Sequence, residues 1–231
     1  MTDYCPTVPT EVAQRMRGWH DEHYAVLRNV GEDGLTVNYL GLDLLIPPQV
    51  QIIEPTSDLL GRAVLDEVRP GDRVLDMGTG SGVNAILAAR VADSVTAVDI
   101  SPHALSAARG NAARNGVADR VSVHRSDVFS DVRGRFDLVV FDPPFRWFRP
   151  RDWAEAAITD ENYRALTDFF EQVSEHLAPG GRVLVFFGTT ADVGYLEQLV
   201  DDNGFTSEVI ARRAMDKDGH PVEYRTYRLV R

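Results

Sequence analysis

Short apolar runs alternate with amphipathic segments along most of the chain after Gly71. The runs have the length of strands, and the segments between them repeat their apolar residues at helical spacing. This alternation predicts a mostly parallel sheet with helices on both faces. The predicted strands are Arg73–Met77, Ser94–Ile100, Val121–His124, Phe136–Phe141, Arg182–Phe187, Phe205–Arg213 and Glu223–Val230. The helices predicted between them are Val83–Val91, Pro102–Asn115, Glu161–Leu177 and Ala191–Asn203.

The last two predicted strands are joined by a short polar loop around Asp216–Gly219, which leaves no room for a helix. Two neighbouring strands with so short a connection run antiparallel. The predicted fold class is therefore α/β: a doubly wound, Rossmann-like, mostly parallel seven-stranded sheet that ends in a C-terminal antiparallel hairpin.

The residues before this alternation predict a small N-terminal lead-in made of a helix and a β-hairpin. We expect the lead-in to cover residues 1–55 and the catalytic domain to cover residues 56–231. The elements predicted before the first strand of the sheet are the helix Thr10–Tyr24, the hairpin strands Val26–Val30 and Leu35–Leu40, an extended piece Leu42–Ile46, and the helix Leu59–Val68.

Composition narrows the class of protein. The chain has 231 residues, of which 44% are hydrophobic and 26% are charged, the balance of an ordinary globular protein. No apolar run is long enough to span a membrane, and the first residues are too polar for a secretory signal. We therefore expect a cytoplasmic protein that does not contact a membrane.

Charge and ligand-forming residue types exclude further classes. The net charge of −11 argues against a basic surface that coats nucleic acid, so no DNA partner is expected. Cys5 is the single cysteine, which excludes a zinc site built from cysteines. His20 and His23 share a helix face but have no third ligand in view, so no metal site is predicted.

The most informative segment is the glycine-rich turn between the first strand of the alternation and the next helix. Such a turn lets the backbone approach a bound nucleotide closely. A dinucleotide-binding turn of the Gly-x-Gly-x-x-Gly type would need glycine where the chain has Val83. The glycines fall instead at Gly78, Gly80 and Gly82, preceded by Asp76 at the strand end. This arrangement resembles the first motif of class I S-adenosylmethionine-dependent methyltransferases.

Acidic residues end the next two strands as well. Asp99 closes the second strand, where a carboxylate can accept hydrogen bonds from both ribose hydroxyls of a nucleotide. Asp127 follows the third strand. A single strand-end aspartate can simply cap the next helix, but three of them beside a glycine turn indicate a nucleotide-like cofactor site.

The resemblance implies S-adenosylmethionine as the cofactor and assigns its contacts. Asp127 would meet the adenine amino group, and the backbone amide of Val128 would meet a ring nitrogen. The cofactor-binding residues that the resemblance implies are Asp76, Gly78, Thr79, Gly80, Gly82, Asp99, Ile100, Asp127 and Val128.

A second motif, Asp142-Pro143-Pro144-Phe145, follows the fourth strand. The two prolines end the strand and hold the backbone rigid, so that its carbonyl groups face the crevice. A carboxylate, fixed carbonyls and an aromatic face suit a planar nitrogen, whose N–H groups the oxygens accept while the ring stacks on it. The alternative is a loop that only ends the strand. We predict all four residues as catalytic.

Residues 42–231 as a whole resemble the "methyltransferase small" group, whose last motif is Asn/Asp-Pro-Pro-Tyr/Phe. Glu54–Asp58 before a helix is similar to the lead-in of release-factor glutamine methyltransferases. Ser126–Phe129 followed by Gly134–Asp137 is similar to ribosomal RNA guanine methyltransferases. The resemblance implies transfer of a methyl group from S-adenosylmethionine to a nitrogen.

The acceptor stays open at this point. Asp142 and Phe145 stand where the glutamine enzymes typically carry Asn and Tyr, and a carboxylate would also attract a cationic acceptor. The expected acceptor is a protein glutamine-type amide or a small-molecule nitrogen; the alternatives are a ribosomal RNA guanine amine and a non-catalytic nucleotide-binding protein. Arg146–Trp153 is rich in arginine and aromatic residues, so it could stack on a base, bind an acidic small molecule, or form a partly packed lid.

Overall fold

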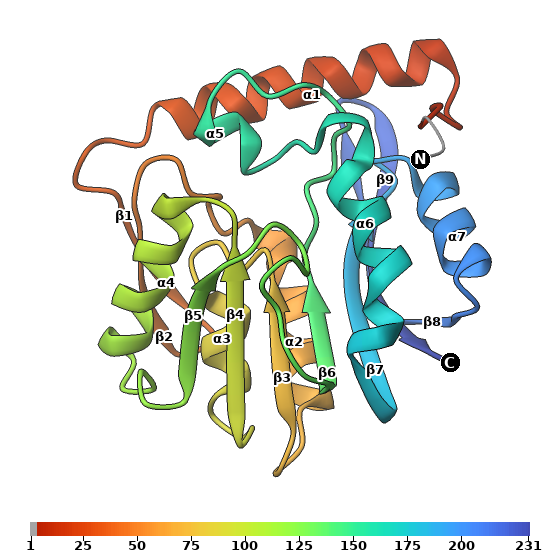
Figure 1. The fold of residues 1–231 in the computed structure, drawn as a ribbon. Coiled ribbons are helices and arrows are strands. Elements are labelled where there is room, and N and C mark those ends of the chain that lie inside the picture. The colour runs from red at the N-terminus through yellow and green to blue at the C-terminus, as the bar shows by residue number, and fades with distance from the viewer. Residues whose placement is uncertain (1–3) are drawn as a thin grey trace.

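A twisted seven-stranded sheet forms the centre of the structure, a computed structural model that describes residues 4–231 (Figure 1). Its strands are β3 (Arg73–Met77), β4 (Ser94–Asp99), β5 (Val121–Arg125), β6 (Phe136–Phe141), β7 (Leu177–Gly188), β8 (Thr206–Lys217) and β9 (His220–Val230). The strand order is β5-β4-β3-β6-β7-β9-β8, in which the first five strands are parallel and β9 and β8 form an antiparallel hairpin. The predicted fold class is confirmed.

Helices cover both faces of this sheet. They are α2 (Asp58–Glu67), α3 (Val83–Ala88), α4 (Pro102–Arg114), α6 (Arg164–Val173) and α7 (Val193–Asp202). Successive strand residues alternate between two cores: Val183 and Val185 pack with α6 and α7, whereas Leu184 and Phe186 pack with α2, α3 and α4. Figure 1 shows α6 and α7 in front of the sheet and α2 and α3 behind it.

The first helix is longer than predicted. α1 (Thr10–Arg28) continues four residues past Tyr24, because Leu27 extends its buried face and packs with Tyr24 against Ala154 and Ile158. The strand predicted at Val26–Val30 is therefore wrong, since its first residues belong to this helix. Neither α1 nor any other helix within residues 4–231 is long and apolar enough to cross a membrane.

The N-terminal hairpin does not pair Val26–Val30 with Leu35–Leu40, as predicted, but pairs the next two extended segments. Its strands are β1 (Leu35–Tyr39) and β2 (Leu42–Ile46), which pair antiparallel around Leu40 and Gly41. Both turn residues have positive φ, 48° and 73°, the backbone that a two-residue hairpin turn requires. β2 buries Leu42, Leu44 and Ile46 in the same core as α2 and α3, so the lead-in packs directly on the rest of the chain.

The helix predicted at Glu161–Leu177 is shorter at both ends. Asn162 and Tyr163 have positive φ values of 55° and 47°, which no right-handed helix has. They interrupt the 3₁₀ turn Glu161–Tyr163, so α6 begins only at Arg164. At the other end, β7 begins at Leu177, where the predicted helix was to end. The other 3₁₀ turns are Pro55–Ser57 and Ser174–His176.

Two further helix boundaries and one additional helix differ from the predictions. α3 ends before Val91, and α7 begins after Ala191, where the Asp192 carboxylate accepts the Tyr195 N–H. The segment after Pro144 is not all loop: it contains the short helix α5 (Trp153–Ala156), which the Asp152 carboxylate caps.

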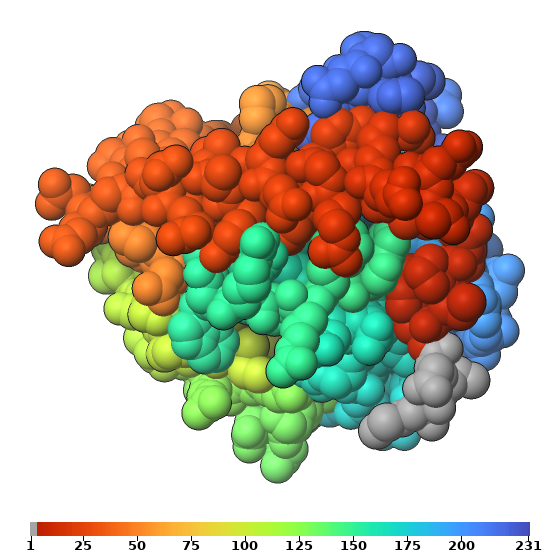
Figure 2. Space-filling view, turned by 90° about the horizontal axis from the view of Figure 1, so that it is seen from above, coloured from red at the N-terminus to blue at the C-terminus, as the bar shows by residue number. Residues whose placement is uncertain are grey.

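Helix α1 crosses the C-terminal ends of the parallel strands, with α5 beside it (Figure 1). We call α1 and α5 together the roof. Trp19 Nε1 donates a 2.7 Å hydrogen bond to the Asp218 carboxylate in the β8–β9 turn, and the Tyr24 hydroxyl donates one of 2.6 Å to Asp152. From above, α1 lies between the segment that contains α5 and the tip of the β8–β9 hairpin (Figure 2).

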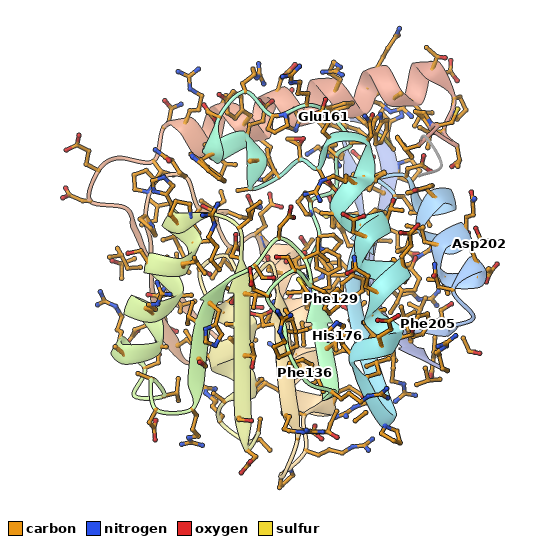
Figure 3. The ribbon with its side chains drawn as sticks, viewed as in Figure 1. Phe129, Phe136, Glu161, His176, Asp202 and Phe205 are labelled. Carbon is orange, nitrogen blue, oxygen red and sulfur yellow. The ribbon has the colours of Figure 1, made fainter. Side chains whose placement is uncertain are left out.

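The loop after β5 is anchored to the core beside α6. The ring of Phe129 stacks on His176 with 4.4 Å between centroids and lies 5.6 Å from Phe169 (Figure 3). This anchor holds in place the two residues before it, Asp127 and Val128, which belong to the predicted cofactor site.

Candidate functional site

A cavity of about 960 Å³ lies at the C-terminal ends of the parallel strands, beneath the roof. Ligands of open α/β sheets bind at this edge, and the volume suits a cofactor with a second small group. The predicted site residues that line it are Gly78, Thr79, Gly80, Asp99, Ile100, Asp127, Val128, Asp142, Pro143, Pro144 and Phe145. The structure thus brings both predicted motifs to one cavity, while Asp76 and Gly82 are buried outside its lining.

The glycine turn has the backbone that its residues predict. Gly78 and Gly80 have positive φ, 64° and 54°, and the Gly80 N–H donates to the Asp99 carboxylate at 3.0 Å. Gly82 also has positive φ, 85°, and it has a second reason to be glycine: a Cβ there would lie 2.9 Å from the Cα of Ala108 in α4. Gly82 therefore permits close helix packing behind the cavity wall.

Asp76 holds the turn from behind. Its Oδ2 accepts the Thr79 hydroxyl at 2.5 Å and the Ala85 N–H at 3.1 Å, so it joins the turn to the first residues of α3. Burial raises the pKa of Asp76 to about 7, and the hydrogen bonds from Thr79 and Ala85 oppose this shift only in part. Asp76 shapes the surface that faces the cavity.

Asp99 is the acid best placed to meet a ribose. One carboxylate oxygen accepts the Gly80 N–H and the other accepts the Ser101 N–H at 2.9 Å. Burial raises the pKa of Asp99, and these backbone N–H groups act in the opposite direction. A carboxylate has about four lone-pair sites, so each oxygen keeps acceptor capacity on the side that lines the cavity.

Asp127 and Val128, like Asp99, line the cavity. Asp127 accepts a 2.8 Å hydrogen bond from Arg164, and its side chain is 44% exposed. Val128 has φ of 47°, a strained conformation for a β-branched residue. The Ser126 hydroxyl, which donates to the Val128 carbonyl at 2.6 Å, helps to hold it. Strain of this kind is concentrated at binding sites.

Asp142 faces the cavity from the end of β6. Enclosure by the surrounding protein raises the pKa of Asp142 to about 7, with further repulsion from the carboxylates of Asp76 and Glu54. The side chain itself is exposed to the cavity. Water there stabilises the carboxylate, so the shift is largest when a ligand displaces that water.

Phe145 belongs to an aromatic cluster in the wall of the cavity. Its ring centroid lies 5.2 Å from Phe187, 5.6 Å from Phe186 and 6.1 Å from Tyr224. The Phe145 carbonyl accepts the Tyr163 hydroxyl at 2.7 Å. This bond fixes the chain after the two prolines, so the motif presents a rigid surface to the cavity.

The arginine- and aromatic-rich segment Arg146–Trp153 is packed inward in its first half. Trp147 and Phe148 are buried, and so is Arg146, whose side chain donates to the Thr190 carbonyl. Arg149, Arg151 and Trp153 are exposed, so the segment is packed only in its first half. It forms part of the roof and the cavity wall, which supports the interpretation as a partly packed lid.

Several lining residues were not predicted, because they come from distant parts of the chain. They are Trp19, His20 and His23 from α1, Gln51 and Glu54 from the loop before α2, Thr190 after β7, and Lys217 and Tyr224 from the β8–β9 hairpin. Glu161, which Figure 3 shows just beneath α1, is another. In the sequence, only the similarity of Glu54–Asp58 to release-factor glutamine methyltransferases could have identified one of them, Glu54.

His20, Asp21 and Glu155 are close enough to share a metal ion within the described part of the chain. The Glu155 carboxylate, however, already accepts from the Arg151 guanidinium at 2.6 and 2.7 Å and contacts His20 Nε2 at 2.7 Å. Burial raises the pKa of Glu155, but these hydrogen bonds lower it to about 2. The contacts of Glu155 with Arg151 and His20 therefore explain the cluster without a metal ion: they link α1 to α5.

Comparison with known families identifies the family of this chain. A sequence model described as the Methyltransferase small domain matches residues 51–200, a range that contains the glycine turn, the strand-end aspartates and the Asp142–Phe145 motif. The chain belongs to the methyltransferase small domain family. The predicted resemblance to class I methyltransferases is therefore confirmed.

Two curated relatives of this methyltransferase small domain protein carry different names. A ribosomal protein L11 methyltransferase of Pelotomaculum thermopropionicum is 52% identical over 86 residues, which are 37% of this chain and 28% of the relative. A release factor glutamine methyltransferase of Koribacter versatilis is 36% identical over 168 residues, covering 65% of this chain and 59% of the relative. The matches thus span less than two thirds of either relative. The release-factor branch is found among the relatives, and the ribosomal RNA branch stays a prediction.

Solved structures agree on the fold. The ribosomal protein L11 methylase of Lactobacillus delbrueckii subsp. bulgaricus aligns with a TM-score of 0.59 and 26% identity, over 80% of this chain and 83% of that chain. A tRNA methyltransferase of Methanocaldococcus jannaschii aligns with a TM-score of 0.64 over 87% of this chain and 58% of that one. Its 18% identity supports the shared methyltransferase fold alone.

Proposed function

We propose that this protein transfers a methyl group from S-adenosylmethionine to a planar amide or amino nitrogen. One observation carries the proposal: Asp99 with the glycine turn and the Asp142–Phe145 motif line the same cavity. A cofactor held by the first group would have its reactive end directed at an acceptor held by the second. Such proximity is the main source of rate in a transfer of this kind.

The residues of the first group fit S-adenosylmethionine. Asp99 keeps acceptor capacity for ribose hydroxyls, and the bare backbone of Gly78 and Gly80 permits close approach. Asp127 and Val128 would hold the adenine. The class I methyltransferase family uses this cofactor. When bound, it supplies an electrophilic methyl group on a sulfonium, which the acceptor's lone pair attacks as the carbon–sulfur bond breaks.

The chain's own residues would bind and orient the acceptor nitrogen. Asp142 in its ionised form accepts an N–H hydrogen bond and can take up the proton that the nitrogen loses. Phe145 offers an aromatic face to a planar group, and its aromatic neighbours keep that face in place. The roof limits the access of water to the cavity.

Among the acceptors, a glutamine-type amide or a small molecule is favoured over an RNA amine. The net charge is −11, and Arg146 and Arg151 are hydrogen-bonded within the protein, which leaves Arg149 as the one exposed arginine of the segment after the motif without a salt bridge among the described residues. RNA binding depends on such exposed cations.

Thermal unfolding with ligands tests the cofactor assignment. S-adenosylhomocysteine should raise the melting temperature, whereas NAD should not. Binding to the folded state alone adds about 2.7 kcal/mol of stability at a hundredfold excess over the dissociation constant, or roughly 5–10 °C for a domain of this size. Protection by NAD instead would contradict the proposal.

Labelled-methyl transfer tests the reaction. The protein and S-adenosylmethionine with a labelled methyl group are added to a cell extract, which is then separated into protein, small-molecule and RNA fractions. Label in the protein or small-molecule fraction supports the favoured acceptors, and label in RNA supports the alternative. S-adenosylhomocysteine binding without any transfer indicates a non-catalytic binder.

A further inference from the structure

Arg146 is a buried cation in the cavity wall without an acidic partner. Its side chain is 8% exposed, and it lines the cavity directly after Phe145. No carboxylate oxygen among residues 4–231 lies within 4.0 Å of its guanidinium nitrogens. One nitrogen, Nη1, donates to the Thr190 carbonyl, while Nε is buried and has no hydrogen-bond partner.

Another buried arginine of the same chain shows what a structural role requires. Arg182 is 4% exposed and pairs with Asp72 at 2.8 Å and with Glu67 at 3.3 Å. Arg146 is nearly as buried and lacks any such pair. Glu54 is the one acid whose charge acts on the pKa of Arg146, and it lies 3.9 Å from His23.

An unpaired guanidinium in this position is unfavourable in the empty protein. Removal from water disfavours the charged form and lowers the pKa of Arg146, yet arginine stays protonated at any physiological pH. The missing negative charge must then come from outside the chain. A second donor lies beside it: the buried Thr190 hydroxyl also lines the cavity and has no hydrogen-bond partner.

We propose that Arg146 and Thr190 bind an oxyanion of the acceptor, a carboxylate or a phosphate, while Asp142 binds its nitrogen. The guanidinium edge formed by Nε and Nη2 has no partner among the described residues, and this planar edge matches an oxyanion. This proposal rests on the proposed function and narrows the class of methyl acceptor. The acceptor class is then a small amine or amide that carries an acidic group.

Calorimetry with small probes tests this assignment. The probes are 4-aminobenzoate, 4-aminophenyl phosphate and aniline, which share a planar nitrogen and differ in the anion. Each is titrated into the protein with and without saturating S-adenosylhomocysteine. We expect at least one anionic probe to bind about ten- to a hundredfold more tightly than aniline. Whichever of the two anionic probes binds better identifies the carboxylate or the phosphate as the ligand.

The variants are Arg146→Met, Arg146→Lys and the matched control Arg149→Met, which removes an exposed arginine outside the cavity lining. Arg146→Met should abolish the preference for the anion, Arg146→Lys should keep part of it, and Arg149→Met should keep all of it. Thr190→Val should reduce it, which provides a second test if Arg146→Met does not fold.

Two results overturn the assignment: wild-type protein that binds all three probes alike, or an anion preference that survives Arg146→Met. Failure of the proposed function gives a different result. In that case S-adenosylhomocysteine does not bind, yet the Arg146-dependent preference measured without it persists, and the oxyanion site stands alone.

Discussion

The two halves of the cavity are built in opposite ways. In the half proposed to bind the cofactor, here called the cofactor half, Asp99 accepts two backbone N–H groups and Asp127 is paired with Arg164, so each acid already has partners. In the acceptor half, Asp142 receives no hydrogen bond from residues 4–231, and Arg146 has no acidic partner there. The first half is prearranged, whereas the second half holds charges that a ligand must satisfy.

This difference separates the general part of the site from the specific part. A nucleotide cofactor is the same molecule in every member of a family, and short backbone-fixed motifs suffice to bind it. An acceptor differs from one protein to the next, and unpaired charges in an enclosed cavity reject any ligand that does not match them. The acceptor half should therefore determine specificity.

The largest effect should come from Asp99→Ala. The variant loses the acceptor for the ribose hydroxyls and leaves the Gly80 N–H without its partner, at about 1.5–3 kcal/mol for each hydrogen bond to a charged group. Calorimetry with S-adenosylhomocysteine should show affinity reduced at least a hundredfold. Asp137→Ala, which removes an acid paired with Arg73 outside the cavity, is the control and should bind normally. Unchanged affinity in Asp99→Ala would remove this residue from the cofactor site.

Asp142→Ala should separate the two halves. Loss of the hydrogen bond to the acceptor should lower turnover about ten- to a hundredfold, while S-adenosylhomocysteine affinity stays within about twofold of wild type. Asp142→Asn keeps one acceptor oxygen and should retain more activity with a neutral amide or aromatic amine. If cofactor affinity falls as far as turnover in Asp142→Ala, the division between the halves is wrong.

The pH dependence of kcat/KM should follow Asp142. Its pKa is raised to about 7, so the carboxylate that accepts the N–H forms only as the pH rises through that value. Activity should fall about tenfold per unit below it, and Asp142→Asn should flatten this limb. Stability should change in the opposite direction: the folded state holds a proton on the buried Asp76 that the unfolded chain loses near pH 4, so unfolding free energy declines between about pH 4 and 7. Activity and stability that fall together below pH 7 would contradict this assignment.

The smallest effect should come from the link between the roof and the β8–β9 turn. Trp19→Phe removes the indole donor to Asp218 and should destabilise the protein by about 1 kcal/mol, or roughly 2–4 °C in melting temperature. Asp218→Asn keeps an acceptor oxygen and tolerates the positive φ of 53° at this position, so it should stay close to wild type. Cofactor affinity should not change in either variant, whereas the acceptor KM should rise in Trp19→Phe.

The cofactor half could be predicted from the sequence because its signals are local. Gly78, Gly80 and Asp99 stand at strand ends, and parallel strands bring such ends to one edge of a sheet whatever the rest of the chain does. The Asp142–Phe145 motif was recognisable for the same reason. What each residue contacts in a bound ligand stays a prediction.

The roof could not be predicted in this way. The amphipathic pattern of α1 shows that one face is buried, but not which surface covers it. That surface depends on contacts between positions far apart, such as His20 with Glu155, 135 residues later in the chain. The misplaced strand at Val26–Val30 had a similar cause, because the burial of Leu27 against Ala154 and Ile158 outweighs the β-propensity of the valines.

The hydrogen bond between Trp19 and Asp218 joins residues 199 positions apart, and this separation sets an order of events during synthesis. A ribosome releases the chain from the N-terminus, so α1 emerges long before the hairpin that holds it. The sheet edge with the glycine turn and the contacts between α1 and α5 can form while synthesis continues, whereas the link from α1 to the hairpin waits until Asp218 has emerged. A chain stopped before Asp218 would thus contain both motifs and a roof that lacks its link to the hairpin.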